Sequence, residues 1–183
     1  MRVIGGEARG RRLKLPKELD IRPTSDRVRE AMFDVLDHLD LIEDAVVGDL
    51  FAGTGALGIE AASRGAKSVV FVDSDRVAGT AIEANLESTA VRELCSCRFS
   101  RSDALVWCRS GREHLDVCFV DPPYAYEQWA ALLAVLPAEF VVLESNREIE
   151  LPERFELHRH YRYGTTLVTM AQRRPDGHAP RTP

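Results

Sequence analysis

The residues best suited to chemistry form the run Asp121-Pro122-Pro123-Tyr124, which directly follows the apolar segment LDVCFV. The Asp121 carboxylate and a carbonyl oriented by Pro122, whose φ is fixed, can both accept hydrogen bonds from one amino group. Two such acceptors localise the lone pair of an aryl amine, and the Tyr124 ring can stack on an extruded base. We therefore predict that Asp121, Pro122, Pro123 and Tyr124 are catalytic residues that align the exocyclic NH₂ of a nucleobase with an electrophile.

A glycine-rich segment, GDLFAGTGALG at residues 48–58, ends a predicted strand and begins a predicted helix. Its glycines satisfy G-x-G-x-x-G, and Asp73 ends the next predicted strand 20 residues after Gly53, which also fits a dinucleotide site. Asp49 lies four residues before Gly53, where a carboxylate repels a pyrophosphate but suits the ammonium and sulfonium charges of S-adenosylmethionine. We therefore predict S-adenosylmethionine as the cofactor, with NAD as the less favoured alternative.

The predicted cofactor site draws on the ends of three strands. Asp73 can accept hydrogen bonds from both hydroxyls of a ribose, which either cofactor offers. Asp103 follows the third predicted strand, where its carboxylate either reads the adenine edge or caps the next helix, and both roles stay open. The predicted cofactor-binding residues are Asp49, Phe51, Gly53, Thr54, Gly55, Asp73, Ser74, Asp103 and Ala104.

Alternating strands and helices position these residues. Short runs rich in Val, Leu and Phe, apolar on both faces, alternate with runs of helical spacing, which predicts an α/β fold with a doubly wound, Rossmann-like sheet. Two final β-prone runs joined at Gly164 predict an antiparallel hairpin and a reversed last strand, as in class I methyltransferases. A first helix is expected to begin at a Thr24 or Ser25 cap and to run to Leu39. The other expected helices are 56–64, 76–88, 104–109 and 127–136, and the expected strands are 45–51, 68–73, 97–100, 116–121, 139–144, 155–163 and 165–172.

The charges divide the chain unequally. The net charge is −5, yet residues 1–29 contain nine Arg or Lys and four acids, whereas the remaining residues contain 15 bases and 25 acids. This asymmetry predicts a basic N-terminal arm or hairpin that binds RNA phosphates, although a solubilising basic tail is the alternative. The expected organisation is a basic arm at 1–23, a methyltransferase domain at 24–172 and a disordered, proline-rich tail at 173–183.

Other classes of protein are disfavoured by composition. No run of 18 apolar residues exists, and the basic N-terminus lacks the apolar segment of a secretory signal. The four cysteines and the His158/His160 pair lack the spacing of a metal site or a disulfide framework, so no metal is expected. We expect a monomeric, cytoplasmic protein with reduced thiols and no membrane contact.

Several segments resemble the RsmD-type family of bacterial 16S ribosomal RNA guanine-N2 methyltransferases. The resemblance covers about residues 1–172 and rests on RVIGGEARGRRL, RPTSDRVREAMFDVL, DLFAGTGALG, DPPY and YGTTLV. It implies methylation of guanine 966 in the 16S rRNA of an assembled or partly assembled 30S subunit. It also implies that residues 22–27 lie beside the active site, and Asn85 matches a helix position without an assigned role. The implied RNA-contact residues are Arg9, Arg11, Arg12, Lys14, Arg22, Thr24 and Arg27.

Three alternatives are weighed against this interpretation. An adenine-N6 methyltransferase acting on DNA or another RNA shares the mechanism and the cofactor, but it usually needs a target-recognition domain for which this chain has no room. An NAD-binding oxidoreductase leaves the Asp-Pro-Pro-Tyr run unexplained. A non-catalytic RNA-binding module of the same fold does not need the combination of Asp49, Asp73 and Asp121.

Overall fold

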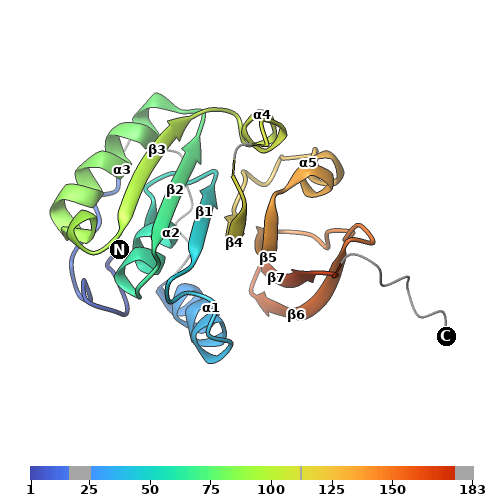
Figure 1. Cartoon of the computed structure of the whole chain (residues 1–183), viewed down its shortest axis with the longest axis horizontal. Coiled ribbons are helices and arrows are strands. Elements are labelled where there is room, and N and C mark those ends of the chain that lie inside the picture. The colour runs from blue at the N-terminus through green and yellow to red at the C-terminus, as the bar shows by residue number, and fades with distance from the viewer. Residues whose placement is uncertain (17–25, 112, 176–183) are drawn as a thin grey trace.

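The computed structural model describes residues 1–16, 26–111 and 113–175, which form a seven-stranded sheet with helices on both faces (Figure 1). All the expected elements occur in it, with bounds within one or two residues of those expected for every element whose ends are described. The strands are β1 (Val46–Leu50), β2 (Ser68–Asp73), β3 (Ser96–Arg101), β4 (Leu115–Val120), β5 (Ala138–Ser145), β6 (Phe155–Tyr163) and β7 (Thr166–Arg173). The helices are α1 (Asp26–His38), α2 (Ala56–Ser63), α3 (Arg76–Thr89), α4 (Ala104–Arg109) and α5 (Trp129–Val135), with a 3₁₀ turn, η1 (Val91–Glu93).

The strand order is β3-β2-β1-β4-β5-β7-β6, and the first five strands are parallel. β7 runs antiparallel to β5 and pairs with β6 as a hairpin, which confirms the predicted class I methyltransferase sheet with its reversed last strand. The chain proceeds outward from β1 through β2 and β3, and then returns to the other side of β1 with β4. Open α/β sheets bind ligands at the carboxyl ends of their strands where the order reverses in this way, so β1 and β4 mark the expected site.

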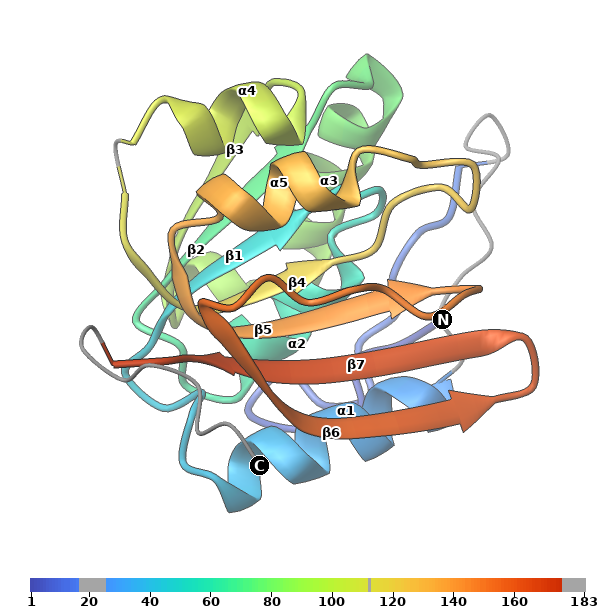
Figure 2. The same ribbon diagram turned by 90° about the vertical axis from the view of Figure 1, so that its right-hand side faces the viewer.

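The two faces of the sheet are covered by different helices, as Figure 2 shows. Alternate residues of a strand point to opposite faces. Val117 and Phe119 of β4 therefore pack with α1, α2 and α3, whereas Cys118 and Val120 pack with α4 and α5. Ring contact between Phe33 of α1 and Phe119, with centroids 5.3 Å apart, anchors α1 beneath β4.

Two glycines shape the elements next to the site. Gly58 in α2 permits close packing on β2, because a Cβ there would lie 2.4 Å from Cε1 of Phe71. Gly164 has a φ of 61° and forms a two-residue turn with Thr165 between the paired residues Tyr163 and Thr166. A glycine with positive φ at the first central position suits the twist of a tight hairpin.

The N-terminal segment packs into the same core as the helices. Its backbone forms an antiparallel pair, with the Val3 N–H donating to the Arg11 carbonyl at 2.9 Å and the Leu13 N–H to the Met1 carbonyl at 3.1 Å. The side chains of Val3, Ala8 and Leu13 are buried with those of α1 and α2. The basic arm is therefore a docked hairpin over residues 1–16.

The C-terminal end departs slightly from expectation. Arg173 belongs to β7 because its backbone pairs with Phe155, and the Arg174 N–H donates to the Arg154 carbonyl at 2.8 Å. The expected tail began at residue 173, but this residue is the last of β7. Residues 176–183 lie outside the described part of the chain. Among the described helices, none is long and apolar enough to cross a bilayer.

Candidate active site

The strand register places the predicted cofactor and catalytic residues side by side. Leu50 of β1 pairs with Val72 of β2 on one side and with Val120 of β4 on the other. The glycine loop, Asp73 and Asp121 directly follow these three residues, so they leave the sheet at the same edge. The Asp121 N–H donates to the Leu50 carbonyl at 3.4 Å, which joins the catalytic segment to the end of β1.

The glycine loop, residues 51–55, turns the chain sharply from β1 into α2. Phe51 has a φ of 59°, Gly53 of 54° and Gly55 of 76°. The Gly55 N–H donates to the Ala52 carbonyl at 2.7 Å and closes the turn. A left-handed conformation costs a residue with a side chain on the order of 1–3 kcal/mol, and such strain clusters at functional sites. The strained backbone at Phe51 therefore makes the glycine loop a candidate functional site.

The Asp49 carboxyl is buried beneath this loop, with only 2% of its surface exposed. Its Oδ2 accepts a hydrogen bond from the Gly58 N–H at 2.8 Å, near the start of α2. Burial raises the pKa of Asp49 to about 8, against the lowering effect of the Gly58 hydrogen bond, and the charge of Asp73 raises it further. The carboxyl is therefore mostly neutral at pH 7, and an adjacent cation would favour its ionisation.

Asp73 ties the glycine loop to the start of α3. Its Oδ2 accepts a hydrogen bond from the Gly53 N–H at 2.9 Å, and its Oδ1 accepts one from the Asp75 N–H at 2.9 Å. Each carboxylate oxygen can accept a second hydrogen bond, so the predicted contact with ribose hydroxyls is compatible with both. Ser74, the next predicted residue, is exposed.

Asp103 caps α4. Its Oδ1 accepts a hydrogen bond from the Val106 N–H at 2.9 Å, so the capping alternative is present in the structure. The cap uses only Oδ1, so the predicted contact between Asp103 and an adenine edge is compatible with the capping role. Ala104, which the sequence also assigned to the cofactor, is buried at the first position of the helix.

The Asp-Pro-Pro-Tyr segment extends from the end of β4 toward the final hairpin. Pro122 is buried, and the Pro123 carbonyl accepts a hydrogen bond from the Tyr126 N–H at 2.8 Å. Tyr124 is 38% exposed, and its Oη lies 3.5 Å from Oγ1 of Thr166 at the start of β7. The tip of the β6–β7 hairpin therefore lies against the predicted catalytic segment, a contact between residues 42 positions apart that no local pattern indicates.

Tyr126 is a candidate site residue that the sequence analysis missed. Its ring packs edge-on against Phe51 and Trp129, with centroids 5.0 Å and 5.6 Å away. Its hydroxyl is buried without a hydrogen-bond partner among the described residues. Burial, followed by the charges of Asp103 and Cys108, raises the pKa of Tyr126 to about 12. An unpaired buried hydroxyl is costly, which makes it a candidate contact for a ligand at the glycine loop.

Asn85 has a physical role that its position in the sequence did not indicate. The side chain is fully buried in α3. Its Oδ1 accepts a hydrogen bond from the Lys14 N–H at 2.7 Å, and its Nδ2 donates to the Lys14 and Thr54 carbonyls at 3.1 and 2.9 Å. One amide thereby links the basic arm to the glycine loop.

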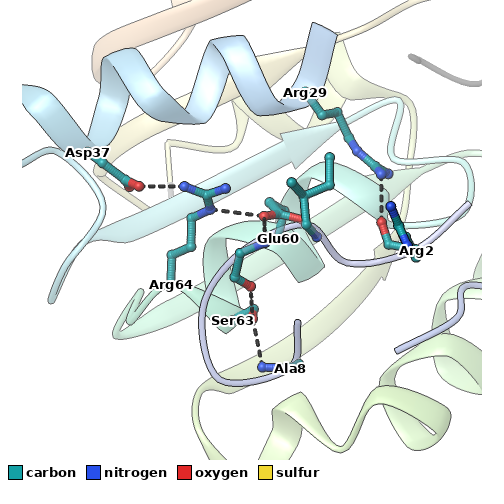
Figure 3. A network of polar contacts seen from close by, with 9 residues as sticks. Arg2, Ala8, Arg29, Asp37, Glu60, Ser63 and Arg64 are labelled. Carbon is teal, nitrogen blue, oxygen red and sulfur yellow. Dashed lines mark hydrogen bonds and ion pairs between the residues drawn. The ribbon is translucent and has the colours of Figure 1, made fainter. Parts of the chain in front are cut away.

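Buried polar groups of α2 hold the arm in place (Figure 3). The Glu60 carboxylate, 1% exposed, accepts hydrogen bonds from the Ile4 N–H at 2.8 Å and the Gly5 N–H at 2.7 Å. The Ser63 hydroxyl donates to the Gly5 carbonyl at 2.6 Å and accepts from the Ala8 N–H at 2.9 Å. These bonds fix the backbone of the arm without using its basic side chains.

Arg29 attaches the arm to α1 as well. Its guanidinium is completely buried, and Nη2 donates to the Arg2 carbonyl at 2.7 Å and to Oδ1 of Asp26 at 2.9 Å. Burial lowers the pKa of Arg29, and the charges of Glu60 and Asp26 oppose that shift. The start of α1 is thus held against the first residues of the chain.

The predicted RNA-contact residues in the described part of the chain are all exposed. Arg11 differs from the others because its Nη1 donates to the Thr89 carbonyl at the end of α3, where a cation also stabilises the helix dipole. Arg22 and Thr24 lie outside the described residues. The remaining exposed members are Arg9, Arg12, Lys14 and Arg27.

Comparison with known proteins agrees with this architecture. The family model described as Conserved hypothetical protein 95 matches residues 1–172. Ribosomal RNA small subunit methyltransferase D of Escherichia coli (strain K12) is 33% identical over 188 residues, which cover 97% of this chain and 92% of the relative. The solved structure of yhhF from Escherichia coli has 33% identity and a TM-score of 0.82, and the match covers 94% of this chain and 97% of that one.

A more distant solved structure shares the fold alone. SMU.776, which was solved in complex with SAH, is 14% identical with a TM-score of 0.57, and the match covers 72% of this chain and 46% of that one. The predicted fold and the RsmD-type resemblance are both confirmed. The chain belongs to the Conserved hypothetical protein 95 family of RsmD-type methyltransferases, with the fold of class I enzymes that depend on S-adenosylmethionine.

Proposed function

We propose that this protein transfers the methyl group of S-adenosylmethionine to N2 of guanine 966 in the 16S rRNA of the 30S subunit. The observation that carries the proposal is the adjacency of the glycine loop and the Asp-Pro-Pro-Tyr segment, which follow paired residues of β1 and β4. The name of the Escherichia coli relative supports small-subunit rRNA as the substrate class. The choice of guanine and of its position rests on the family resemblance.

The charge of the glycine loop suits S-adenosylmethionine. Burial raises the pKa of Asp49 to about 8, so this carboxyl ionises at neutral pH only when a cation lies beside it. Together with the charge of Asp73, this disfavours a pyrophosphate and favours a cationic ligand. The bound cofactor supplies an electrophilic methyl group on a sulfonium. Asp73 is assigned to the ribose hydroxyls, and Phe51, Tyr126 and Asp103 to the adenine side of the site.

The catalytic segment acts on the amino group of the base. The Asp121 carboxylate and the Pro122 carbonyl accept its two N–H hydrogens, and Tyr124 stacks on the extruded ring. A bond from N2 to the methyl carbon forms as the sulfur–methyl bond breaks, and the proton released by the product nitrogen passes to Asp121 or to water. Alignment of this kind can contribute on the order of 7–11 kcal/mol, so no strong base is needed.

The basic arm is assigned to RNA binding. Arg9 and Arg12 are exposed on a hairpin whose backbone is already fixed by Glu60, so little conformational entropy is lost when they meet phosphates. Arg27 extends this surface to the first turn of α1. We assign the functional unit to a monomer acting on a 30S particle, whose shape supplies specificity that a small enzyme cannot.

Methyl transfer to purified 30S subunits from a strain that lacks the modification tests the proposal. Tritiated S-adenosylmethionine should label 16S rRNA, and nuclease mapping should place the label on N2 of guanine 966. Asp121→Ala should lower turnover by at least about a thousandfold, while calorimetry shows SAH affinity within a few fold of wild type. Label on an adenine would favour the adenine-N6 alternative, and binding of NADH in place of SAH would contradict the cofactor assignment.

A further inference from the structure

The charge of the chain changes sign at the start of the final hairpin. Residues 113–156 contain ten acids and two bases, whereas residues 157–174 contain four arginines and no acid. Most of this second stretch forms β6 and β7, and β6 is one of the two edge strands of the sheet, opposite β3. Residues 156–160 of β6 are exposed. An acidic domain therefore presents a basic strand at one edge, separate from the basic arm.

Three side chains on one face of β6 form a continuous surface, which we call the β6 strip: Arg159, Tyr161 and Tyr163. Nη1 of Arg159 donates to Oη of Tyr161 at 3.2 Å. The rings of Tyr161 and Tyr163 lie with centroids 6.2 Å apart and an interplanar angle of 31°. Both rings are partly buried, whereas Arg159 is exposed and forms no ion pair with a described residue. The strip thus joins the positive charge of Arg159 to two adjacent aromatic rings that pack against the core and are still partly exposed.

The β6 strip leads to the predicted catalytic segment. Tyr163 pairs in register with Thr166, and Oγ1 of Thr166 lies 3.5 Å from Oη of Tyr124. Figure 2 shows the tip of the hairpin at the same end of the sheet as the carboxyl end of β5. Side-chain contacts and the cross-strand pair of Tyr163 with Thr166 therefore connect Arg159, on the edge strand, with Tyr124 of the Asp-Pro-Pro-Tyr segment.

We propose that the β6 strip binds the single-stranded RNA next to the target nucleotide, an inference that rests on the proposed rRNA methylation. Bases stack on Tyr161 and Tyr163, and Arg159 contacts a phosphate. Stacked aromatics combined with arginine suit single strands, because every base has a face and every nucleotide carries a charge. The absence of acids between residues 157 and 174 favours a polyanion over a protein partner of mixed charge.

The two basic surfaces then hold the substrate from opposite sides. The arm lies beside α3, on the side of the sheet whose edge strand is β3, and β6 is the edge strand on the other side (Figure 1). The carboxyl ends of β1 and β4 lie between them. RNA that contacts both surfaces places an extruded base near Asp121, so the two surfaces together could align one nucleotide with the site.

Charge reversal on the strip tests the inference. Arg159→Glu is compared with Arg109→Glu, which makes the same change at an exposed arginine at the end of α4, on the opposite face of the sheet. Filter binding to unmodified 30S subunits over a range of salt should show at least tenfold weaker affinity for Arg159→Glu. Its log–log salt slope should be shallower by roughly 0.7 or more, the contribution of one phosphate on a single strand. Arg109→Glu should match wild type within about twofold.

Stacking is tested separately on Tyr163. Tyr163→Ala should weaken 30S binding by at least about fivefold, the lower end of the effect of losing one stacked base, and Tyr163→Phe should restore it. In methyl-transfer assays, Arg159→Glu should raise KM for 30S subunits and leave kcat within about twofold. Affinity for SAH should stay at the wild-type value in Arg159→Glu. The arginine is exposed on β6, and β4, β5 and β7 separate this strand from β1 and the glycine loop.

The outcomes separate this inference from the proposed function. Normal methylation by wild type together with equal binding by Arg159→Glu and Arg109→Glu would overturn the strip and leave the function standing. Failure of wild type to methylate 30S subunits would overturn the function, while the binding comparison would still decide the strip. Weaker binding to 30S subunits but unchanged binding to protein-free 16S rRNA would mean that the strip contacts a ribosomal protein and would overturn the RNA assignment.

Discussion

Replacing Asp49 with asparagine is expected to have opposite effects on the stability of the fold and on cofactor binding. Asparagine matches aspartate in shape, and its Oδ1 can still accept the Gly58 N–H that Oδ2 of Asp49 accepts at 2.8 Å. The substitution therefore removes the charge of a side chain that is 2% exposed and leaves its packing intact. What changes is the response of the protein to pH.

The magnitude follows from the pKa of Asp49, which burial raises from its ordinary value of 3.8 to about 8. Between these values the folded protein retains a proton that the unfolded chain releases. The stability due to the protonated group is complete below about pH 4 and is lost as the pH rises toward 8. At about 1.4 kcal/mol per pKa unit this shift corresponds to a loss of about 6 kcal/mol. That value is an upper limit, because relaxation and water penetration reduce it. Asp49→Asn should avoid this loss.

Cofactor binding should respond in the opposite direction. The ionised carboxylate favours the positive amino-acid end of the ligand, so binding requires loss of the Asp49 proton below its pKa. The affinity of wild type for SAH should therefore increase by up to about tenfold per unit between roughly pH 6 and pH 8. Asp49→Asn should bind more weakly at pH 8 and show only the titration of the ligand itself.

Two measurements check this reasoning. Urea unfolding near pH 5 and pH 8.5 should show a stability advantage of the variant that is much larger at the higher pH. Calorimetry with SAH should show pH profiles that diverge between the two proteins above pH 6. Parallel binding profiles would mean that Asp49 serves only to hold the Gly58 N–H, and equal stabilities at both pH values would mean that the carboxyl is not strained by burial.

Other substitutions test the supports of the site. Glu60→Gln should lower the free energy of unfolding by about 1–3 kcal/mol, because buried N–H groups of the arm lose a charged acceptor, and should speed hydrogen exchange at Gly5; unchanged exchange would mean that the arm is held by its apolar contacts. Asn85→Ala should cost a similar amount in urea unfolding and also weaken SAH binding, since the Thr54 carbonyl loses its donor; a stability loss with normal SAH affinity would restrict Asn85 to the arm. Tyr126→Phe should raise the thermal stability of the free protein slightly and weaken SAH binding by about tenfold; unchanged affinity would place the ligand away from this hydroxyl.

The order of strands and helices was predictable because each element carries its own signal. β2 begins and ends where the apolar run VVFV predicts, and α4 occupies the expected residues because Asp103 supplies a local cap. Hydrophobic periodicity and caps act over a few residues, so one sequence reveals them. The glycine loop and the Asp-Pro-Pro-Tyr segment were predictable for the same reason, and parallel topology then brought them to one edge.

The supporting contacts were not predictable because they join distant segments. Asn85 bonds to Lys14 across 71 positions, and Glu60 bonds to Ile4 across 56. A glutamate at helical spacing ordinarily indicates a solvated face, and only the docked arm explains its burial here. Tyr126 could not be predicted for a different reason. Its hydroxyl is a candidate ligand contact because it is buried without a hydrogen-bond partner among the described residues, and only the structure shows this.

The distribution of charge is the feature that connects fold and chemistry. The carboxyl ends of the central strands β1, β2 and β4 hold carboxyl groups, which suit a cationic cofactor. The arm and the β6 strip place arginines on either side of them. Screening limits electrostatic attraction to about 8–10 Å at physiological salt, so these regions act on their own ligands with little mutual cancellation. The net charge of −5 therefore conceals two opposite local fields. A protein that must bind a sulfonium and a polyanion at adjoining sites needs this separation, because a uniform charge of either sign would repel one of the two.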